Sequence, residues 1–367
     1  MRRQFGPEGN EFPVLEYQMQ QWRLLPYLAA TYIVKCFGRS FFENLVNFVM
    51  SQFNSDYTPE KIATWGAEMH AISSSMKPLA GWLARDAIQE CREACGGHGY
   101  LSCAGIGRLR DDNDANCTYE GDNNVLLQQT SNWLLTIWAH PNKEKLAKEM
   151  PLNTLSFMSN LPKNFKFRAQ TKQDLMNPHV LLNTYKWLIG WLTESTANKY
   201  QSILKESGNS FSAKNDSQIY HARNLSLAFI EHYILERFWN VQCCDEHIPE
   251  NIRNIFKRMM LLYGWWSLEK HLTILYQGGL IQGAEPAALI KATILDLCTL
   301  LKPEAVALVD AIAPPDFILN SALGKSDGLV YKNLQLAMSQ TPGGYERPVW
   351  WKDVASKIAT TKANAKL

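Results

Sequence analysis

The sequence has no long apolar run, little net charge and almost no signal for β-strands. No uninterrupted apolar stretch approaches the roughly 18 to 20 residues that a membrane-spanning helix needs. The net charge of +2 argues against a surface built to attract nucleic acid or anionic lipid. Two arginines stand near the N-terminus without an apolar region after them, so they do not predict a secretory signal. We therefore expect no membrane span and no nucleic-acid partner.

A regular cysteine framework is also missing, since the eight cysteines are scattered. In a chain of 367 residues, such scattering is typical of a reduced, intracellular protein. Cys91, Cys95, His98 and Cys103 could be drawn as a zinc site. However, the first two cysteines lack the usual separation of about two residues, and no second closely spaced pair follows. We expect no metal centre and interpret the segment as packing of a glycine-rich loop.

Helical periodicity is abundant. Apolar residues recur at helical spacing over Leu15–Tyr32, although Pro26 should kink or restart this helix. A second helix is expected over residues 59–93. Thr58 is its predicted N-cap and Gly96-Gly97 its predicted end, because a hydroxyl caps free N–H groups and glycine tolerates a left-handed backbone.

The helical patterns fall into two groups. A third helix should start after Asp122 or Asn123 and run to Trp138. Prolines then interrupt a segment that is rich in Asn and Lys, which is typical of a linker. Further helical patterns follow over residues 179–205, 217–240, 250–276 and 285–312. The sequence predicts an all-α chain with two helical bundles, over residues 1–140 and 173–360. A linker over residues 141–172 joins the bundles, and a tail over residues 361–367 follows the second.

The stretch Cys91–Gln129 is long, glycine-rich and placed between two predicted helices. Its Gly96–Gly99 run would let the backbone approach another group closely, but a helix end followed by a turn explains it equally well. Glu120 lies between Tyr119 and Gly121 at a loop–helix junction, where partial desolvation would make its carboxylate a stronger base. On residue type alone, the favoured alternative is a charge that interacts with the helix dipole.

Three motifs occur in a fixed order along the chain. They are Arg2-Arg3-Gln4-Phe5-Gly6, GGHGY at 96–100, and TYEGDNNVLLQQ at 118–129, with an RDD segment before the last. Together they resemble the acyl-CoA oxidase and acyl-CoA dehydrogenase superfamily. The resemblance implies an FAD cofactor, a homodimer and a set of site residues. Glu120 would be the catalytic base, Tyr119 and Gly121 would contact substrate, and the cofactor would be held by Arg2, Gln4, Phe5, Gly96 and Gly97.

In the family, the arginine at the position of Arg2 reaches the FAD pyrophosphate of the neighbouring subunit, and a guanidinium suits a phosphate. Two departures limit the resemblance to the dehydrogenases. Glu93 stands where they commonly have glutamine, and Asp122 where they often have threonine. The segments 13–17, 20–30 and 311–317 resemble the peroxisomal acyl-CoA oxidases of branched-chain substrates, the pristanoyl-CoA oxidases.

The resemblance implies α,β-desaturation of a fatty acyl-CoA to the trans-2-enoyl-CoA. Glu120 would take the α-proton, the β-hydrogen would leave as hydride to the flavin, and O2 would be reduced to H2O2. Family members carry a helical domain and a β-domain before this region. We therefore expect a C-terminal half that starts inside a larger protein and binds FAD poorly by itself.

The last residues, Ala365-Lys366-Leu367, resemble the Ser-Lys-Leu peroxisomal address that an import receptor reads. They predict a peroxisomal protein. Two other interpretations remain: an acyl-CoA dehydrogenase with a protein electron acceptor, and a non-catalytic, truncated fragment that only dimerises.

Overall fold

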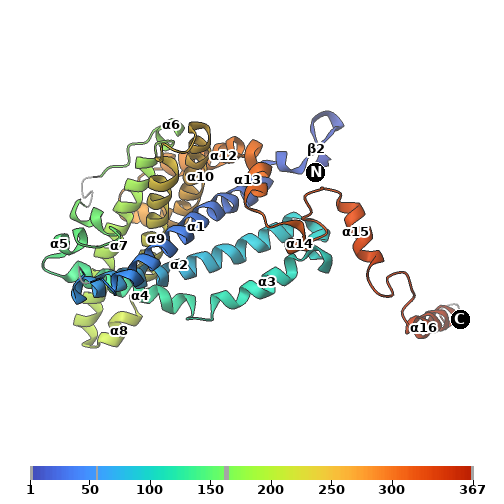
Figure 1. Ribbon diagram of the computed structural model, residues 1–367, viewed down its shortest axis with the longest axis horizontal. Helices are drawn as coiled ribbons and strands as arrows, with labels where there is room; N and C mark the ends of the chain where they lie inside the picture. Colours follow the sequence, from blue (N-terminus) through green and yellow to red (C-terminus); the bar gives the residue numbers. More distant parts are fainter. Residues whose placement is uncertain (1–2, 55–56, 161–164, 365–367) are drawn as a thin grey trace. The chain divides into compact units, whose positions relative to one another are not determined.

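The computed structural model describes residues 3–54, 57–160 and 165–364. The chain forms two compact units. The larger unit comprises Arg2–Cys91 and Arg110–Ile312, and the smaller comprises Arg92–Leu109 and Ala313–Leu367. Apart from one short hairpin, the described secondary structure is helical (Figure 1). The prediction of an all-α chain is confirmed.

Helix α1 spans Gln18–Ser51 and belongs to the larger unit. The helix continues through Pro26, so the predicted restart at this proline is wrong. A proline inside a helix removes one backbone hydrogen bond. Here Leu25 and Ala29 on either side of it are buried in the core, and their burial offsets that loss.

Helix α2 spans Pro59–Ala94, and the prediction for this helix is confirmed at both ends. The Thr58 hydroxyl accepts a hydrogen bond from the Lys61 N–H at 3.4 Å, as expected of an N-cap. Past the helix end, Gly96 has a φ of 61°, the left-handed conformation that commonly terminates a helix.

Helix α3 (Ile106–Asp114) begins in the smaller unit and ends in the larger. The helices of the larger unit that follow it are α4 (Asn123–Ala139), α5 (Lys143–Lys148), α6 (Lys172–Leu175), α7 (Pro178–Ser207), α8 (Ser210–Asn215), α9 (Arg223–Phe238), α10 (Glu250–Leu268), α11 (Leu272–Gln277), α12 (Glu285–Leu301) and α13 (Ala305–Ile312).

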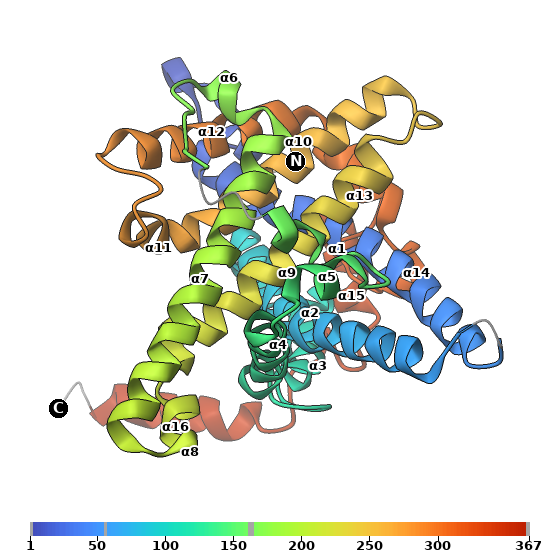
Figure 2. The ribbon, with the colours of Figure 1, turned by 90° about the vertical axis from the view of Figure 1, so that its left-hand side faces the viewer.

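The core of the larger unit is formed where α1, α4, α7, α9, α10 and α12 pack together. Helices α7 and α9 lie side by side (Figure 2). Helices on both sides of the predicted linker share this one core, because α1 packs on α10 and α4 packs on α9. The predicted division of the chain into two helical domains, at residues 140 and 173, therefore stays a prediction. The largest buried side chains include Tyr185, Phe229, Tyr263 and Trp265.

The segment predicted as a linker is partly built into this core. Its Leu155 and Phe157 are buried. The fully buried carboxylate of Glu68 on α2 accepts hydrogen bonds from the N–H groups of Leu152 and Thr154 at 2.8 and 3.1 Å, and from the Thr154 hydroxyl at 2.6 Å. These bonds fix the loop on the side of α2.

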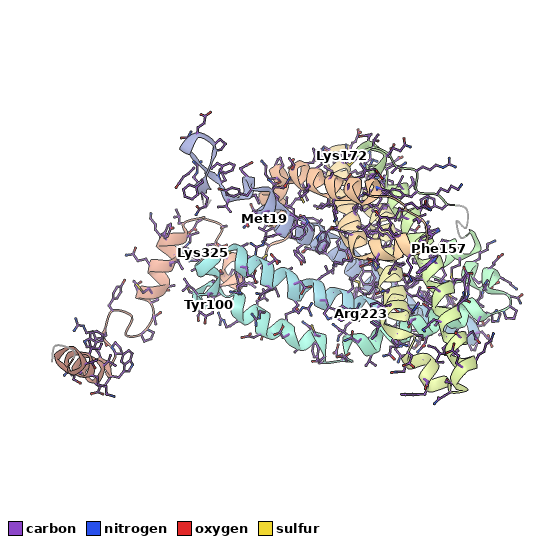
Figure 3. The ribbon with its side chains drawn as sticks, turned by 180° about the vertical axis from the view of Figure 1, so that it is seen from behind. Met19, Tyr100, Phe157, Lys172, Arg223 and Lys325 are labelled. Carbon is purple, nitrogen blue, oxygen red and sulfur yellow. The ribbon has the colours of Figure 1, made fainter. Side chains whose placement is uncertain are left out.

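Helix α2 also contacts α9. The guanidinium of Arg223 at the start of α9, labelled in Figure 3, lies 5.0 Å from the centroid of the Trp82 ring. Such cation–π contacts stabilise by about 0.5–1 kcal/mol at exposed sites. The long helix α2 thus serves as a frame on which the segments 150–154 and α9 are placed.

The smaller unit contains α14 (Asp316–Leu319), α15 (Val330–Ser339) and α16 (Trp351–Asn364). Its two stretches of chain are joined by hydrogen bonds. The Ala322 N–H donates to the Cys103 carbonyl at 2.8 Å, and the Ser321 hydroxyl donates to the Ala104 carbonyl at 2.6 Å. The smaller unit is thereby anchored around residues 103–104.

Candidate active site

Glu120 lies in a tight turn that leads into α4. Its φ is 55° and that of Gly121 is 107°, so two consecutive residues have a left-handed backbone. A side chain at position 121 would be strained, because L residues rarely adopt a φ of 107°, and its Cβ would lie 2.9 Å from the Leu126 side chain. For Glu120, the conformation is uncommon and costs about 1–3 kcal/mol. Strain of this kind persists only where the surroundings hold it.

The residues after the turn provide one such restraint. The Asp122 carboxylate accepts hydrogen bonds from the N–H groups of Asn124 and Val125 at 2.9 and 3.3 Å, and α4 begins at Asn123. The predicted start of the third helix is therefore confirmed. Asp122, which departs from the dehydrogenase pattern, serves as the N-cap.

A second restraint comes from α2, and the sequence did not reveal it. The Lys77 ammonium donates to the Gly121 carbonyl at 2.6 Å and to the Asn123 side-chain oxygen at 2.8 Å. Lys77 lies between the buried residues Met76 and Pro78. In the sequence, the position of this lysine between the apolar residues Met76 and Pro78 is the one signal that could have pointed to it.

The Glu120 side chain is exposed. The expectation that its neighbours within this chain desolvate it is therefore not met. The neighbouring Tyr119 is itself 53% exposed, and its hydroxyl donates to the side-chain oxygen of Asn116. Tyr119, Glu120 and Gly121 lie together in one turn, as predicted from their adjacency. Their roles stay predictions.

The glycine run belongs to the smaller unit. A Cβ at Gly99 would collide with the Arg92 carbonyl, so this glycine is required by the local packing. At Gly97 the space is open, with no atom within 4 Å of the position of a Cβ. Gly96 and Gly97 are both exposed. The backbone at Gly97 can therefore be approached closely by another group.

The N-terminal motif forms a hairpin in the larger unit. Strand β1 (Arg3–Phe5) pairs in antiparallel fashion with β2 (Glu11–Pro13), and Gln4 lies opposite Phe12. The Tyr17 hydroxyl donates to the Phe5 carbonyl. The Phe5 side chain is 84% exposed. Arg2 lies outside the described residues, as do Ala365, Lys366 and Leu367 of the predicted targeting tail.

Within the described ranges, no three His, Cys, Asp or Glu side chains are grouped so that they could hold a metal ion. The same part of the chain contains no helix with the length and apolar character needed to cross a membrane.

Comparisons with known proteins agree on one family. Residues 1–135 match the acyl-CoA oxidase C-alpha1 domain, and residues 177–360 match the acyl-CoA oxidase family. Human peroxisomal acyl-coenzyme A oxidase 3 is 45% identical over 355 residues, which cover 96% of this chain and 50% of that protein. The Caenorhabditis elegans acyl-coenzyme A oxidase acox-3 is 36% identical and is covered to 53%. The chain spans about half the length of the curated relatives that it matches.

Solved structures show the same fold. The Arabidopsis thaliana acyl-CoA oxidase 1 superposes with a TM-score of 0.85 at 27% identity, over 98% of this chain and 53% of that one. A C. elegans acyl-CoA oxidase-2 structure, bound with FAD, ascaroside-CoA and ATP, superposes with a TM-score of 0.84 over all of this chain and 52% of that one. At 22% identity, the second likeness shows the fold alone. On the family matches and the human relative, the chain belongs to the acyl-CoA oxidase family.

Proposed function

We propose that this chain carries the catalytic base of an FAD-dependent acyl-CoA oxidase, which desaturates fatty acyl-CoA to trans-2-enoyl-CoA. The observation that carries the proposal is the turn of Glu120. A carboxylate is held at a strained loop–helix junction, in a chain of the acyl-CoA oxidase family. A residue that served only as a helix charge would not need a left-handed backbone, because a charge interacts with the helix dipole from any extended or helical position nearby.

In this mechanism the Glu120 carboxylate takes the α-proton of the thioester. The α-carbon is a weak acid, so negative charge that develops on the thioester oxygen needs hydrogen-bond donors. The Glu120 N–H has no acceptor among the described residues and is proposed as one donor. One such donor lowers the barrier by about 3–4 kcal/mol. The redox chemistry, in which the β-hydrogen leaves as hydride and O2 becomes H2O2, is what FAD supplies when bound.

The residues of the glycine run fit a flavin. A planar ring system can lie against a backbone only where no side chain intervenes, and the open space at Gly97 meets that condition. Gly96 and Gly97 are proposed to contact FAD. The family resemblance assigns FAD contacts also to Gln4 and Phe5 of β1, and to Arg2 from the neighbouring subunit of a homodimer. Tyr119 and Gly121 are proposed to contact the acyl-CoA.

The exposure of Glu120 bears on how the base is activated. A carboxylate in water is too weak a base for this step, so the proposal requires that Glu120 is desolvated during catalysis. The curated relatives are about twice as long as this chain. We propose that the acyl-CoA itself and the part of the enzyme beyond the matched half together cover Glu120.

The relatives' names favour a peroxisomal location. The human and other mammalian relatives are named peroxisomal acyl-coenzyme A oxidases. Ala365-Lys366-Leu367 is proposed to be the address that the import receptor reads. A preference for branched acyl-CoA follows from the likeness to the pristanoyl-CoA branch of the family.

The test is Glu120→Gln in the FAD-loaded enzyme. The amide keeps the size of the side chain but cannot accept a proton, so flavin content should be unchanged while flavin bleaching by acyl-CoA is lost. Glu8→Gln, at another exposed glutamate, is the control and should bleach normally. Release of H2O2 by the unmodified enzyme separates an oxidase from a dehydrogenase. Normal bleaching by the Glu120→Gln enzyme would refute the assignment of the base.

A further inference from the structure

We propose that Lys77 is a positioning residue, which holds the Glu120 carboxylate in place by clamping the turn that carries it. This inference rests on the proposed role of Glu120 as the base and extends it to a residue on a different helix. Lys77 does not touch the reacting atoms in this proposal. It acts on the backbone of residues 121 and 123.

The clamp consists of one ammonium group that bridges both sides of the α4 cap. Lys77 Nζ lies 2.6 Å from the Gly121 carbonyl oxygen and 2.8 Å from the Asn123 side-chain oxygen. Asn123 is 1% exposed, so its end of the bridge is shielded from water. Hydrogen bonds from a charged donor are roughly twice as strong as neutral ones. The bridge therefore restrains the residue before Asp122 and the residue after it at the same time.

The turn needs such a restraint. Glu120 has a φ of 55°, which is unfavourable for a side chain with a Cβ, and Gly121 has access to many backbone conformations. Without a donor at its carbonyl, Gly121 can rotate, and Glu120 can relax to an ordinary conformation. Either movement would swing the carboxylate away from the direction that the turn now gives it.

Helix α2 is placed to hold Lys77 at this point. Gly81 lies one helical turn after Lys77. A Cβ added at Gly81 would lie 3.5 Å from the Asn116 carbonyl oxygen and 3.5 Å from the side-chain nitrogen of Asn123. The backbone of α2 therefore passes close beside the loop. On α4, the Thr130 hydroxyl donates to the carbonyl of Ala71 on α2 at 2.7 Å, and both residues are fully buried. These contacts keep α2 and α4 together, so the Lys77 stem starts from a fixed position.

The geometry also says how Lys77 acts. No ion pair joins Lys77 to Glu120 in the described structure, whereas two hydrogen bonds join Lys77 to the turn. We therefore assign the effect of Lys77 to the position of the carboxylate. Loss of Lys77 should lower the rate of proton removal without moving the pH profile of that rate.

The experiment compares three variants. Lys77→Met removes the ammonium and keeps the length of the stem. Lys77→Arg keeps a cationic donor. Lys61→Met, at an exposed lysine of the same helix, is the matched control. Amide hydrogen exchange at residues 124–126, the hydrogen-bonded start of α4, is measured on the purified chain, and flavin reduction by acyl-CoA is measured on the FAD-loaded enzyme.

We expect exchange at residues 124–126, whose N–H groups bond to Asp122, to rise at least about tenfold in Lys77→Met, because a charged hydrogen bond to the turn before them is lost. Flavin reduction should slow by about 100-fold, the scale of a misplaced catalytic group, while KM, flavin content and the pH profile stay unchanged. Lys77→Arg should restore most of both properties, and Lys61→Met should match the unmodified protein. If Lys77→Met does not fold, Lys77→Gln replaces it with the same expectations.

Unchanged exchange at residues 124–126 in Lys77→Met would overturn the proposal, and so would a shifted pH profile. Unchanged flavin reduction in Lys77→Met, in an enzyme that Glu120→Gln inactivates, would overturn it as well. If Glu120→Gln itself keeps its activity, the assignment of the base fails. The exchange measurement then still decides, separately, whether Lys77 clamps the turn.

Discussion

We predict that His232 on α9 makes the stability of the larger unit depend on pH. The side chain is 1% exposed, and the ring of Phe157, labelled in Figure 3, packs against it with centroids 5.1 Å apart. Its Nε2 has no hydrogen-bond partner within the described structure. Burial lowers the pKa of His232 from 6.5 to about 4, because an imidazolium in this place would lose its hydration.

The charged side chains nearest to His232 do not cancel the lowering of its pKa. Glu236 lies 3.8 Å from Nε2 and favours protonation, but the Lys186 ammonium already pairs with that carboxylate at 2.8 Å. The pKa of His232 is lower in the folded than in the unfolded chain, so its contribution to stability is present above pH 6.5. The contribution is lost as the pH falls toward 4. Each pKa unit is worth about 1.4 kcal/mol, which makes the loss about 3 kcal/mol.

The perturbation that tests this is His232→Leu, which keeps an apolar side chain of similar size next to Phe157. Urea unfolding of the unmodified chain and of the variant is followed at pH values from 7 to 4. Between these limits, the unmodified chain should lose about 3 kcal/mol more of its free energy of unfolding than the variant does. At pH 7 the two should differ little, because the replaced nitrogen has no partner to lose.

His247→Gln, at an exposed histidine, serves as the control and should follow the pH profile of the unmodified chain. An exposed side chain changes its surroundings little on unfolding. Parallel pH profiles for His232→Leu and the unmodified chain would refute the reasoning, because His232 would then be equally easy to protonate in both states.

Two further predictions concern the glycine run and the buried network of the larger unit. Gly99→Ala should lower the melting temperature of the chain, since its Cβ would collide with the Arg92 carbonyl, whereas Gly97→Ala should leave that temperature unchanged but reduce the flavin content of the FAD-loaded enzyme. Equal flavin contents for Gly97→Ala and the unmodified enzyme would argue against flavin contact at Gly97. Glu231→Leu should cost about 1–3 kcal/mol in urea unfolding, because it leaves His271 Nε2 and the Ser267 hydroxyl without their buried partner at 2.8 and 2.7 Å. A cost below about 1 kcal/mol would contradict this.

Features governed by neighbouring residues were predictable from the sequence. The ends of α2 and the start of α4 depend on Thr58, Gly96 and Asp122, whose side chains or backbones act within one helical turn. The same holds for the placement of Glu120 at a loop–helix junction. Local rules of capping and backbone conformation operate over such short distances, and a single sequence contains them in full.

Features governed by distant contacts were not predictable. The bond from Lys77 to Gly121 joins positions 44 residues apart, and those from Glu68 to residues 152–154 join positions 84 to 86 apart. Nothing in the sequence near residue 152 indicates that a carboxylate on α2 will accept its N–H. Composition alone therefore predicted an ordinary linker there. The continuity of α1 through Pro26 likewise depends on core packing and not on the proline.

The proposed role of Glu120 as catalytic base has two separate requirements, the direction of its carboxylate and the removal of water from it. That direction is set inside this chain by Gly121, the Asp122 cap and Lys77, all of which act on the backbone of one turn. Its desolvation is not set here, because the side chain is exposed. A base that is fixed but hydrated is a poor base until its site closes, so free enzyme would not abstract protons from ordinary metabolites. If bound acyl-CoA provides part of the cover, the strength of the proposed base depends on the presence of its substrate. The restraints on the turn would then keep the carboxylate oriented for that substrate.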